Sequence, residues 1–260
     1  MSPILRLLYR LYERRLLRQI GGGALPRHVG IILDGNRRHG RAHGITEPQE
    51  MYRLGAEKLD DILDWCAELT IPTVTLWVFS ADNFRRPESE VSGILAAIEG
   101  KLAALAHDPL IHSRRVRVRA IGRLPLLPPT LLATIDKAER ATEAYDGMDL
   151  NIAVAYGGRQ EIADAVQLLL RDAAAKGASL ADAVGAVTPE AIARHLYTAG
   201  LPDPDLIIRT SGEIRLSGFL LWQSAHSEYY FTDVLWPAFR KIDFLRAIRS
   251  FQERQRRYGA

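Results

Sequence analysis

Residues 28–44, HVGIILDGNRRHGRAHG, join an apolar run to a dense cluster of basic side chains. The run over residues 29–33 predicts a buried strand, and it ends at Asp34, Gly35 and Asn36, a turn-forming sequence. A solvated loop needs neither a glycine turn nor so much positive charge around one carboxylate, so the stretch indicates a functional strand end. The basic or histidine side chains that follow are Arg37, Arg38, His39, Arg41 and His43.

Further β-rich runs follow along the chain, each separated from the last by a long helical pattern. Runs that are apolar on both faces and alternate with helices predict a single α/β domain, with a central, mostly parallel sheet flanked by helices. The runs occupy residues 73–80, 116–122, 150–156 and 205–212. Helices are expected at residues 56–69, 89–106, 129–145, 160–175, 189–197 and 243–257. The segment 173–188, rich in alanine and glycine, is expected to be a flexible surface loop.

Composition restricts the classes of protein to which the chain can belong. Its 260 residues, 47% of them hydrophobic, favour one large domain with a substantial core. Lys plus Arg, 34, exceeds Asp plus Glu, 31, only slightly, so the sequence predicts no nucleic-acid partner. The single cysteine, Cys66, lies in an amphipathic helical pattern and is predicted to be a buried structural thiol in a reducing compartment.

The N-terminal 23 residues have a pattern of their own. Apolar side chains recur near helical spacing opposite an arginine face, and three glycines follow as a hinge. We expect residues 1–23 to form a basic amphipathic helix, either a lid on the domain or a helix on an anionic membrane surface, and residues 24–260 to form the catalytic domain. No apolar run is long enough to span a membrane and no signal-peptide pattern is seen, so we expect a cytoplasmic protein, with peripheral membrane contact through this helix as an alternative.

Polar and basic side chains stand just after four of the expected strands. In a parallel sheet these strand ends meet at one edge, where glycine backbone, helix N-termini and arginine side chains together favour phosphate. A lone carboxylate there, Asp34, would repel phosphate unless Mg²⁺ lies between them or a proton has to be moved. The alternative is that Asp34 caps a helix and pairs with Arg37 or Arg38. The four strand ends carry residues 34–38, 80–87, 156–159 and 209–217.

Other ligand classes are disfavoured by the absence of their motifs. The sequence contains no Walker A loop, no dinucleotide fingerprint, no nucleophile elbow and no zinc-ligand spacing. The acidic motif Asp60, Asp61 and Asp64 matches the Asp-Asp-x-x-Asp pattern of all-helical prenyl-transfer enzymes. We reject it as a site because a second such motif is missing and these aspartates fall on the polar face of an expected helix.

Five blocks of sequence together resemble the cis-prenyltransferases, the undecaprenyl diphosphate synthase family. They are HVGIILDGNRR, TLWVFSADNFRRP, LNIAVAYGGRQEI, DLIIRTSGEIRLSGFLLWQSAHSEYYFTDVLWP and the terminal RRYG, in family order over residues 28–259. The resemblance implies a parallel sheet flanked by helices, with an apolar tunnel, in a homodimer. It also implies a reaction in which isopentenyl diphosphate adds to an allylic diphosphate, geranyl or farnesyl, with a cis double bond formed and pyrophosphate released.

The resemblance further implies roles for individual residues. Asp34 corresponds to the essential aspartate that holds Mg²⁺ at the leaving pyrophosphate, and Glu228 to a second acid associated with the metal. Asn83, with Ser80, corresponds to a pair implicated in removing a proton from isopentenyl diphosphate. The implied allylic diphosphate site comprises Gly35, Asn36, Arg37, Arg38, His39, Ser80, Phe84 and Arg86. The implied isopentenyl diphosphate site comprises Arg209, Arg215 and Ser217, and Arg257 with Gly259 corresponds to a tail that reaches the partner's site.

The chain departs from the family pattern near these sites. His39 replaces an aromatic residue, Gly40 replaces an alanine, and Tyr52 and Ile214 stand where histidines are frequent. Val78 occupies a position where many long-chain members carry a smaller residue, so it is expected to shorten the tunnel. We therefore expect a Z-polyprenyl diphosphate of short or medium length. Two alternatives stay open, namely a long-chain undecaprenyl diphosphate synthase that serves cell-wall carrier lipid, and a catalytically silent scaffold subunit.

Overall fold

A six-stranded sheet lies at the centre of the computed structural model, which describes residues 3–258, with side chains over residues 4–254. Every neighbouring pair of strands is parallel, in the order β3-β4-β2-β1-β5-β6. The prediction of an α/β domain with a mostly parallel sheet is confirmed. The strands are β1 (His28–Ile32), β2 (Thr73–Trp77), β3 (Val116–Ile121), β4 (Met148–Ala153), β5 (Leu206–Arg209) and β6 (Glu228–Phe231).

The sixth strand was not expected from the sequence. β6 pairs with β5 at the edge of the sheet, and all four of its residues are only partly buried. It is short and lacks the apolar alternation of a half-buried strand, so its pairing depends on the long segment 210–227 that brings it beside β5.

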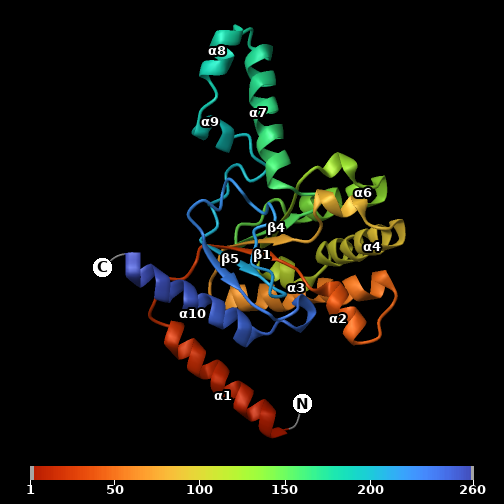
Figure 1. Cartoon of the computed structure of the whole chain (residues 1–260), viewed down its shortest axis with the longest axis vertical. Coiled ribbons are helices and arrows are strands. Elements are labelled where there is room, and N and C mark those ends of the chain that lie inside the picture. The colour runs from red at the N-terminus through yellow and green to blue at the C-terminus, as the bar shows by residue number, and fades with distance from the viewer. Residues whose placement is uncertain (1–2, 259–260) are drawn as a thin grey trace.

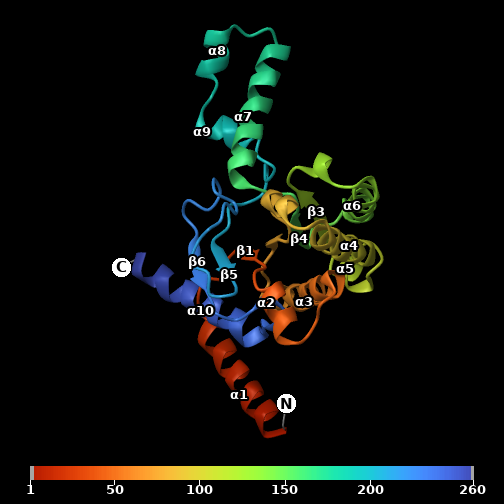
Figure 2. The ribbon, with the colours of Figure 1, turned by 45° about the vertical axis from the view of Figure 1, so that its right-hand side comes forward.

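Helices cover one face of the sheet, and a long loop covers much of the other (Figures 1 and 2). Val29 and Ile31 of β1 pack into the core that also contains apolar side chains of the helices α3, α4, α6 and α10. Ile32 points to the opposite face, where it joins a smaller cluster with Trp77 and Phe219. The helices are α1 (Pro3–Ile20), α2 (Asn36–Ala42), α3 (Pro48–Glu68), α4 (Glu88–Leu105), α5 (Pro109–Ser113), α6 (Pro129–Thr142), α7 (Gly158–Ala175), α8 (Leu180–Gly185), α9 (Pro189–Ala193) and α10 (Lys241–Tyr258).

The helices α7, α8 and α9 form an arm that extends away from the sheet (Figure 1). The arm corrects one expectation, because residues 173–188 are not simply a loop. They include the end of α7 and the short helix α8, whose first turn is capped where Ser179 Oγ accepts a hydrogen bond from the Asp182 N–H at 3.2 Å. An N-cap of this kind stabilises a helix too short for its periodicity to be recognised in the sequence. Helix α3 also begins earlier than expected, at Pro48.

The N-terminal helix is confirmed as a helix, and one side of it packs against α10. Leu16 and Ile20 are buried there, and Arg246 Nε donates to the Tyr12 hydroxyl at 3.2 Å. The opposite side of α1 is exposed to solvent. Among the described residues, none of the helices combines the length and apolar character needed to cross a bilayer.

Cys66 is fully buried in α3, and burial raises the pKa of its thiol to about 12, which agrees with the prediction of a structural thiol.

The order of the strands determines where a ligand can bind. From β1 the chain moves to β2 on one side, whereas β5 and β6 lie on the other side of β1. The carboxyl ends of β1 and β5 therefore flank the point at which the order reverses, and in open α/β sheets ligands bind outside such a point. Ile32 at the end of β1 is in register with Arg209 at the end of β5, so the residues that follow these two strands meet.

Candidate active site

A cavity of about 330 Å³ lies at the carboxyl ends of β1, β2 and β5. It brings together residues from three of the four strand ends named in the sequence analysis, and the fourth, residues 156–159, does not line it. The predicted residues that line it are Asp34, Gly35, Asn36, Arg37, Arg38, Val78, Ser80, Asn83, Arg86, Arg209, Arg215 and Ser217. Residues assigned to the allylic diphosphate site and residues assigned to the isopentenyl diphosphate site therefore line the same cavity.

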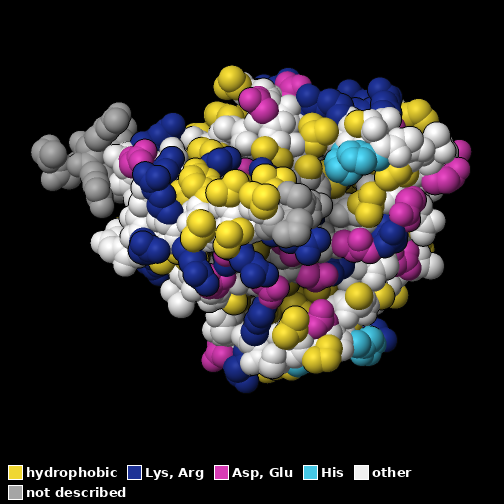
Figure 3. Space-filling view, turned by 90° about the horizontal axis from the view of Figure 1, so that it is seen from below, with side chains coloured by type: hydrophobic (Ala, Val, Ile, Leu, Met, Phe, Trp, Pro, Cys, Tyr) yellow, Lys and Arg dark blue, Asp and Glu magenta, His cyan; other side chains and the backbone are white. Residues whose placement is uncertain are grey.

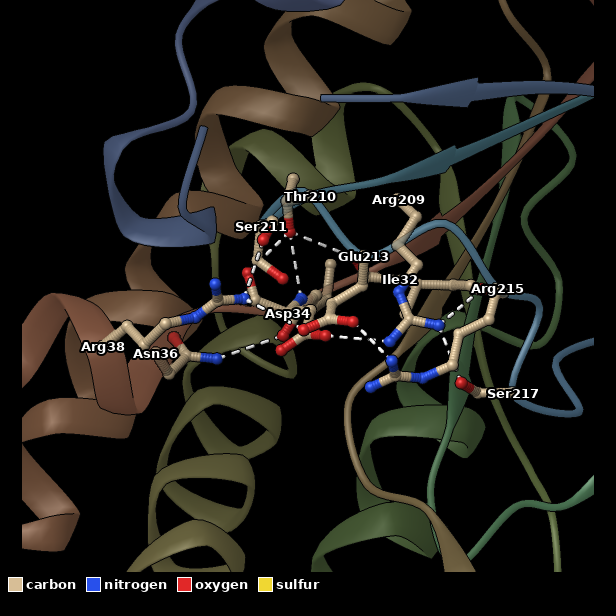
Figure 4. A network of polar contacts seen from close by, with 11 residues as sticks. Ile32, Asp34, Asn36, Arg38, Arg209, Thr210, Ser211, Glu213, Arg215 and Ser217 are labelled. Carbon is tan, nitrogen blue, oxygen red and sulfur yellow. Dashed lines mark hydrogen bonds and ion pairs between the residues drawn. The ribbon is translucent and has the colours of Figure 1, made fainter. Parts of the chain in front are cut away.

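Asp34 lines the cavity and is bound by Arg209, the last residue of β5, and by Thr210, which follows it (Figure 4). Arg209 Nη2 donates to Asp34 Oδ2 at 2.9 Å, and the Arg209 side chain is only 5% exposed. The Thr210 hydroxyl accepts from the Asp34 N–H at 3.0 Å and donates to the Asp34 carbonyl at 2.7 Å. Thr210 was given no role in the sequence analysis, and its only signal there is a hydroxyl directly after a strand.

The contacts of Asp34 decide between its two predicted roles. Gly35, at φ +109°, is the N-cap of α2, and Asp34 pairs with Arg209 rather than with Arg37 or Arg38, so the helix-cap alternative is wrong. Partial burial acts to raise the pKa of Asp34, but the hydrogen bond and charge of Arg209 outweigh it, and the pKa lies below its ordinary value. The side chain is therefore an ionised carboxylate that lines the cavity.

Arg209 also organises the far side of the cavity. Its Nη1 donates to Ser217 Oγ at 2.7 Å and to the Arg215 carbonyl, so one guanidinium links Asp34 to the segment after β5 (Figure 4). Arg215 in turn pairs with Glu213. Arg38 reaches the same segment from α2 and donates to the Ser211 carbonyl at 2.7 Å. The arginines that follow β1 and those at and after the end of β5 therefore line the same cavity.

Ser80 and Asn83 form a capping box on the short 3₁₀ helix after β2 (Ala81–Arg85). The Ser80 hydroxyl accepts from the Asp82 N–H at 3.1 Å, and Asn83 Oδ1 accepts from the Ser80 N–H at 3.0 Å. Because its amide oxygen is engaged in the cap, the amide nitrogen of Asn83 is the group that can meet a ligand. Asn83 is thus arranged as a hydrogen-bond donor and not as a base.

Tyr52 and Arg86 line the cavity side by side, and both bind Glu90, which is not itself a lining residue. Tyr52 donates its hydroxyl to Glu90 Oε1 at 2.7 Å, and Arg86 Nη1 contacts that oxygen at 2.8 Å. Arg37 lies 3.6 Å from Glu90. Burial acts to raise the pKa of Glu90, but Tyr52 and the two arginines outweigh it, so its pKa is lowered. Burial and Glu90 raise the pKa of Tyr52, which stays a neutral donor. Sequence analysis missed Glu90, which carries no motif signal.

Several predicted site residues lie outside the cavity. The His39 ring stacks on His43 with centroids 4.1 Å apart, and Phe84 packs edge-on against Phe79. Ile214 is 80% exposed. Of the predicted tail, Gly259 lies outside the described residues, as does the side chain of Arg257.

Glu228 is also absent from the cavity within one chain. It begins β6 and is in register with Leu206, at the amino end of β5, whereas Asp34 follows the carboxyl end of β1. Its carboxylate lies 2.9 Å from Arg254 of α10. The structure therefore does not bring Glu228 to Asp34, because the two residues lie at opposite ends of parallel strands.

The Asp34 carboxylate can serve as an oxygen ligand for a hard cation that takes most of its other ligands from a substrate. Asp34 is ionised and borders the cavity, and among the described residues there is no group of three or more His, Cys, Asp or Glu side chains able to hold a metal. Mg²⁺ is commonly bound by one or two carboxylates together with phosphate oxygens, so Asp34 is a suitable ligand. The aspartates of the rejected acidic motif are instead engaged in ion pairs: Asp60 with Lys101, Asp61 with Lys58 and Asp64 with Arg114.

Two small apolar cavities lie beside the site, between α3, α4 and the sheet. Their volumes are about 50 and 40 Å³, and Val78 lines both of them as well as the main cavity. Trp236 lines both small cavities, and its Nε1 donates to the Gly55 carbonyl at 2.7 Å. A Cβ on Gly55 would come within 2.2 Å of Asn36 Oδ1, so only glycine lets α3 approach the site this closely. An apolar chain could extend along this route.

Comparison with known proteins finds one family throughout. The family model described as "Putative undecaprenyl diphosphate synthase" matches residues 32–259. An isoprenyl transferase of Thermus thermophilus is 57% identical over 254 residues, which cover 98% of this chain and 96% of that protein. A (2Z,6E)-farnesyl diphosphate synthase of Thermobifida fusca is 53% identical, with 97% of each chain covered. Among solved structures, lavandulyl diphosphate synthase from Lavandula x intermedia, in complex with dimethylallyl diphosphate, has a TM-score of 0.79 at 33% identity and covers 88% of this chain and 95% of that one.

Proposed function

The chain belongs to the undecaprenyl diphosphate synthase family of prenyl transferases, and on that premise we propose that it condenses isopentenyl diphosphate with geranyl or farnesyl diphosphate. The product is a Z-polyprenyl diphosphate, and pyrophosphate is released. The single observation that carries this proposal is the double role of Arg209. It binds Asp34 and also Ser217, so a carboxylate and two clusters of cations share one cavity.

The geometry suits a reaction in which negative charge builds on a leaving diphosphate. Arg37, Arg38 and Arg86 line the side of the cavity proposed for the allylic diphosphate, and Arg209 with Arg215 lines the side proposed for isopentenyl diphosphate. Charge grows on the leaving group as the allylic C–O bond breaks, so fixed cations stabilise the transition state more than the ground state. Asp34 fits as the ligand of Mg²⁺, which when bound would neutralise part of the same charge.

Condensation also requires loss of a proton from isopentenyl diphosphate. Asn83 Oδ1 accepts from the Ser80 N–H, which leaves the amide nitrogen to meet a ligand. We therefore assign Asn83 an orienting role, in which this nitrogen donates to a diphosphate oxygen that can take the proton. Ser80 fixes this arrangement through the capping box.

The proposed product is of short or medium length. Val78 lines the main cavity and the two small ones beside it, which hold only about 50 and 40 Å³. The similarity to a (2Z,6E)-farnesyl diphosphate synthase supports the same choice. A long-chain product and a silent scaffold subunit are the alternatives, but a scaffold has no need of the Asp34–Arg209 pair and the intact cations around it.

Two associations belong to the proposal. The first is a homodimer, in which Arg257 and Gly259 of one chain would reach the site of the other. The second is peripheral contact of α1 with an anionic membrane, for which the amphiphilic product gives a chemical reason.

One assay tests the reaction. The purified protein is incubated with Mg²⁺, radiolabelled isopentenyl diphosphate and either geranyl or farnesyl diphosphate, and the extracted products are sized by chromatography. We expect extension that stops when a chelator is added. The absence of any extension would refute the proposed function, and a main product of undecaprenyl length would refute the short-chain assignment alone.

A further inference from the structure

One aspartate of the acidic motif that was rejected as a metal site links two helices. Asp60, on α3, accepts a hydrogen bond from Lys101 Nζ, on α4, and the two side chains form an ion pair. The neighbouring Asp61 instead pairs with Lys58 within α3. Asp60 therefore differs from its neighbour in joining α3 to α4.

Lys101 also lines the smaller of the two apolar cavities beside the site. Its side chain is only 14% exposed, which is unusual for a lysine, whereas the side chain of Asp60 is 51% exposed. Among the described residues that line either small cavity, Lys101 is the only one that carries a charge. The apolar stem of Lys101 therefore borders the cavity, while its ammonium group reaches the surface at Asp60.

The lining residues show which of the two small cavities lies farther from the main one. Asn36, Tyr52 and Ile94 line both the main cavity and the cavity of about 50 Å³. None of these three lines the cavity of about 40 Å³, which is bordered instead by Leu59 and Lys101. Leu59 follows Tyr52 on α3, and Lys101 follows Ile94 on α4, by two helical turns. Lys101 thus stands at the end of this apolar region that is away from the diphosphate site.

A side chain fixed at this place can limit how far an apolar chain extends. The stem of a lysine is flexible and its ammonium group is strongly hydrated, so an unpaired Lys101 could swing toward solvent and open the end of the cavity. The ion pair with Asp60 keeps the stem across that end. A hydrocarbon chain that extended farther would have to displace the stem and break the pair. Exposed ion pairs contribute little to the stability of a fold, so α3 and α4 do not depend on this pair for their packing.

We propose that the Lys101–Asp60 pair closes the end of the apolar region and sets an upper limit on product length. The inference rests on the proposed function and deepens it, because it assigns a length limit to two side chains outside the diphosphate site. Val78 borders the main cavity and therefore limits growth first, whereas the pair stops a chain that has passed Val78.

The test compares products in the Val78→Ala background, in which chains are expected to pass the first limit. Each variant is incubated with Mg²⁺, geranyl or farnesyl diphosphate and an excess of radiolabelled isopentenyl diphosphate, and the dephosphorylated products are sized by chromatography. We expect Lys101→Ala to extend the longest product by one isoprenyl unit or more, because it removes a stem of similar size. Asp60→Ala should do the same by releasing the ammonium group. The double substitution Asp60→Lys with Lys101→Glu re-forms the pair with reversed charges and should restore the product length of Val78→Ala.

Asp61→Ala is the matched control, since it removes the neighbouring carboxylate, whose partner lies within α3, and it should leave product length unchanged. The inference would be overturned if neither Lys101→Ala nor Asp60→Ala extended the longest product, or if the reversed pair did not restore it. Extension by Lys101→Ala alone would also overturn it, because the volume of Lys101 and not the pair would then set the limit. If Lys101→Ala does not fold, Asp60→Ala, a change at an exposed acid, decides the question. Failure of the proposed function would be seen separately, as a wild-type protein without extension activity.

Discussion

Asp34 owes its chemical character to Arg209. The guanidinium is almost fully buried, so its charge is poorly screened, and it keeps the pKa of the Asp34 carboxyl low even though partial burial acts in the opposite direction. The same guanidinium binds Ser217. Removing the charge of Asp34 should therefore affect the reaction without releasing Arg209, provided that the new side chain can still accept a hydrogen bond.

The substitution Asp34→Asn meets that condition. We expect it to lower kcat by about 100-fold or more, because an amide is a poor ligand for Mg²⁺ while transition-state charge stabilisation of this kind is worth at least that factor. Steady-state assays with a titration of Mg²⁺ measure the effect, and thermal unfolding should show a folded protein. Asp61→Asn is the control, since Asp61 is half-exposed and pairs with Lys58 on the same helix, α3. A variant with near-normal turnover would remove Asp34 from the mechanism.

At the scale of elements, α3 and α4 with the end of β2 form the walls along which a product would grow. Val78 borders the main cavity and both small cavities, as Leu33 also does, so we expect the volume of its side chain to limit how far a product can grow. Val78→Ala removes volume at this point without a polar change. We expect the product distribution to shift by one isoprenyl unit or more toward longer chains, as measured by chromatography of the dephosphorylated products.

Val187→Ala makes the same chemical change on the exposed arm and should leave the distribution as it is. A Val78→Ala enzyme with an unchanged distribution would show that the length limit is set elsewhere, for example by the closely packed Gly55 and Trp236.

Elements differed in how far the sequence could predict them. The first five strands each contain a β-rich run, and four of these runs are followed by polar motifs. A parallel sheet brings such motifs to one edge, so the cavity and most of its lining could be predicted. Helix α8 could not, because it is too short for its periodicity to be recognised, and β6 could not, because its pairing depends on contacts distant in the sequence. The same holds for Glu90, a single acid whose role comes from neighbours on other elements.

Glu228 is the opposite case, a residue that a motif identifies but that the fold does not bring to the cavity within one chain. Its motif matches the family, yet within one chain the parallel register of β5 and β6 places it at the end of the sheet away from Asp34. A sequence motif identifies a residue as a candidate for the site, but it does not show whether the fold brings that residue to the site of its own chain.

At the scale of the whole molecule, the solvent-exposed face of α1 has an apolar part and a basic part. Opposite its contact with α10, Ile4, Leu7, Leu8 and Leu11 are 51–73% exposed. Arg14, Arg15 and Arg18 are exposed on the same helical face, so the prediction that these apolar side chains lie opposite the arginines is wrong for this part of the helix. Seen from below, hydrophobic side chains gather with Lys and Arg side chains beside them (Figure 3). Apolar side chains bordered by cations suit an anionic lipid surface, whereas two such arginine clusters would repel each other across a dimer.

Sedimentation with vesicles tests this contact. We expect binding to vesicles that contain phosphatidylglycerol, weak binding to phosphatidylcholine alone, and release by salt. The triple substitution Arg14→Gln, Arg15→Gln, Arg18→Gln should weaken binding about 100-fold, at about 1 kcal/mol for each arginine near an anionic surface. Leu7→Ser with Leu8→Ser should also release the protein, whereas Leu180→Ser, an exposed leucine on the arm, should not. Unaltered vesicle binding by both α1 variants would contradict the proposal. If sedimentation equilibrium finds a dimer for the wild type but a monomer for the leucine variant, this face would instead be assigned to a second copy of the chain.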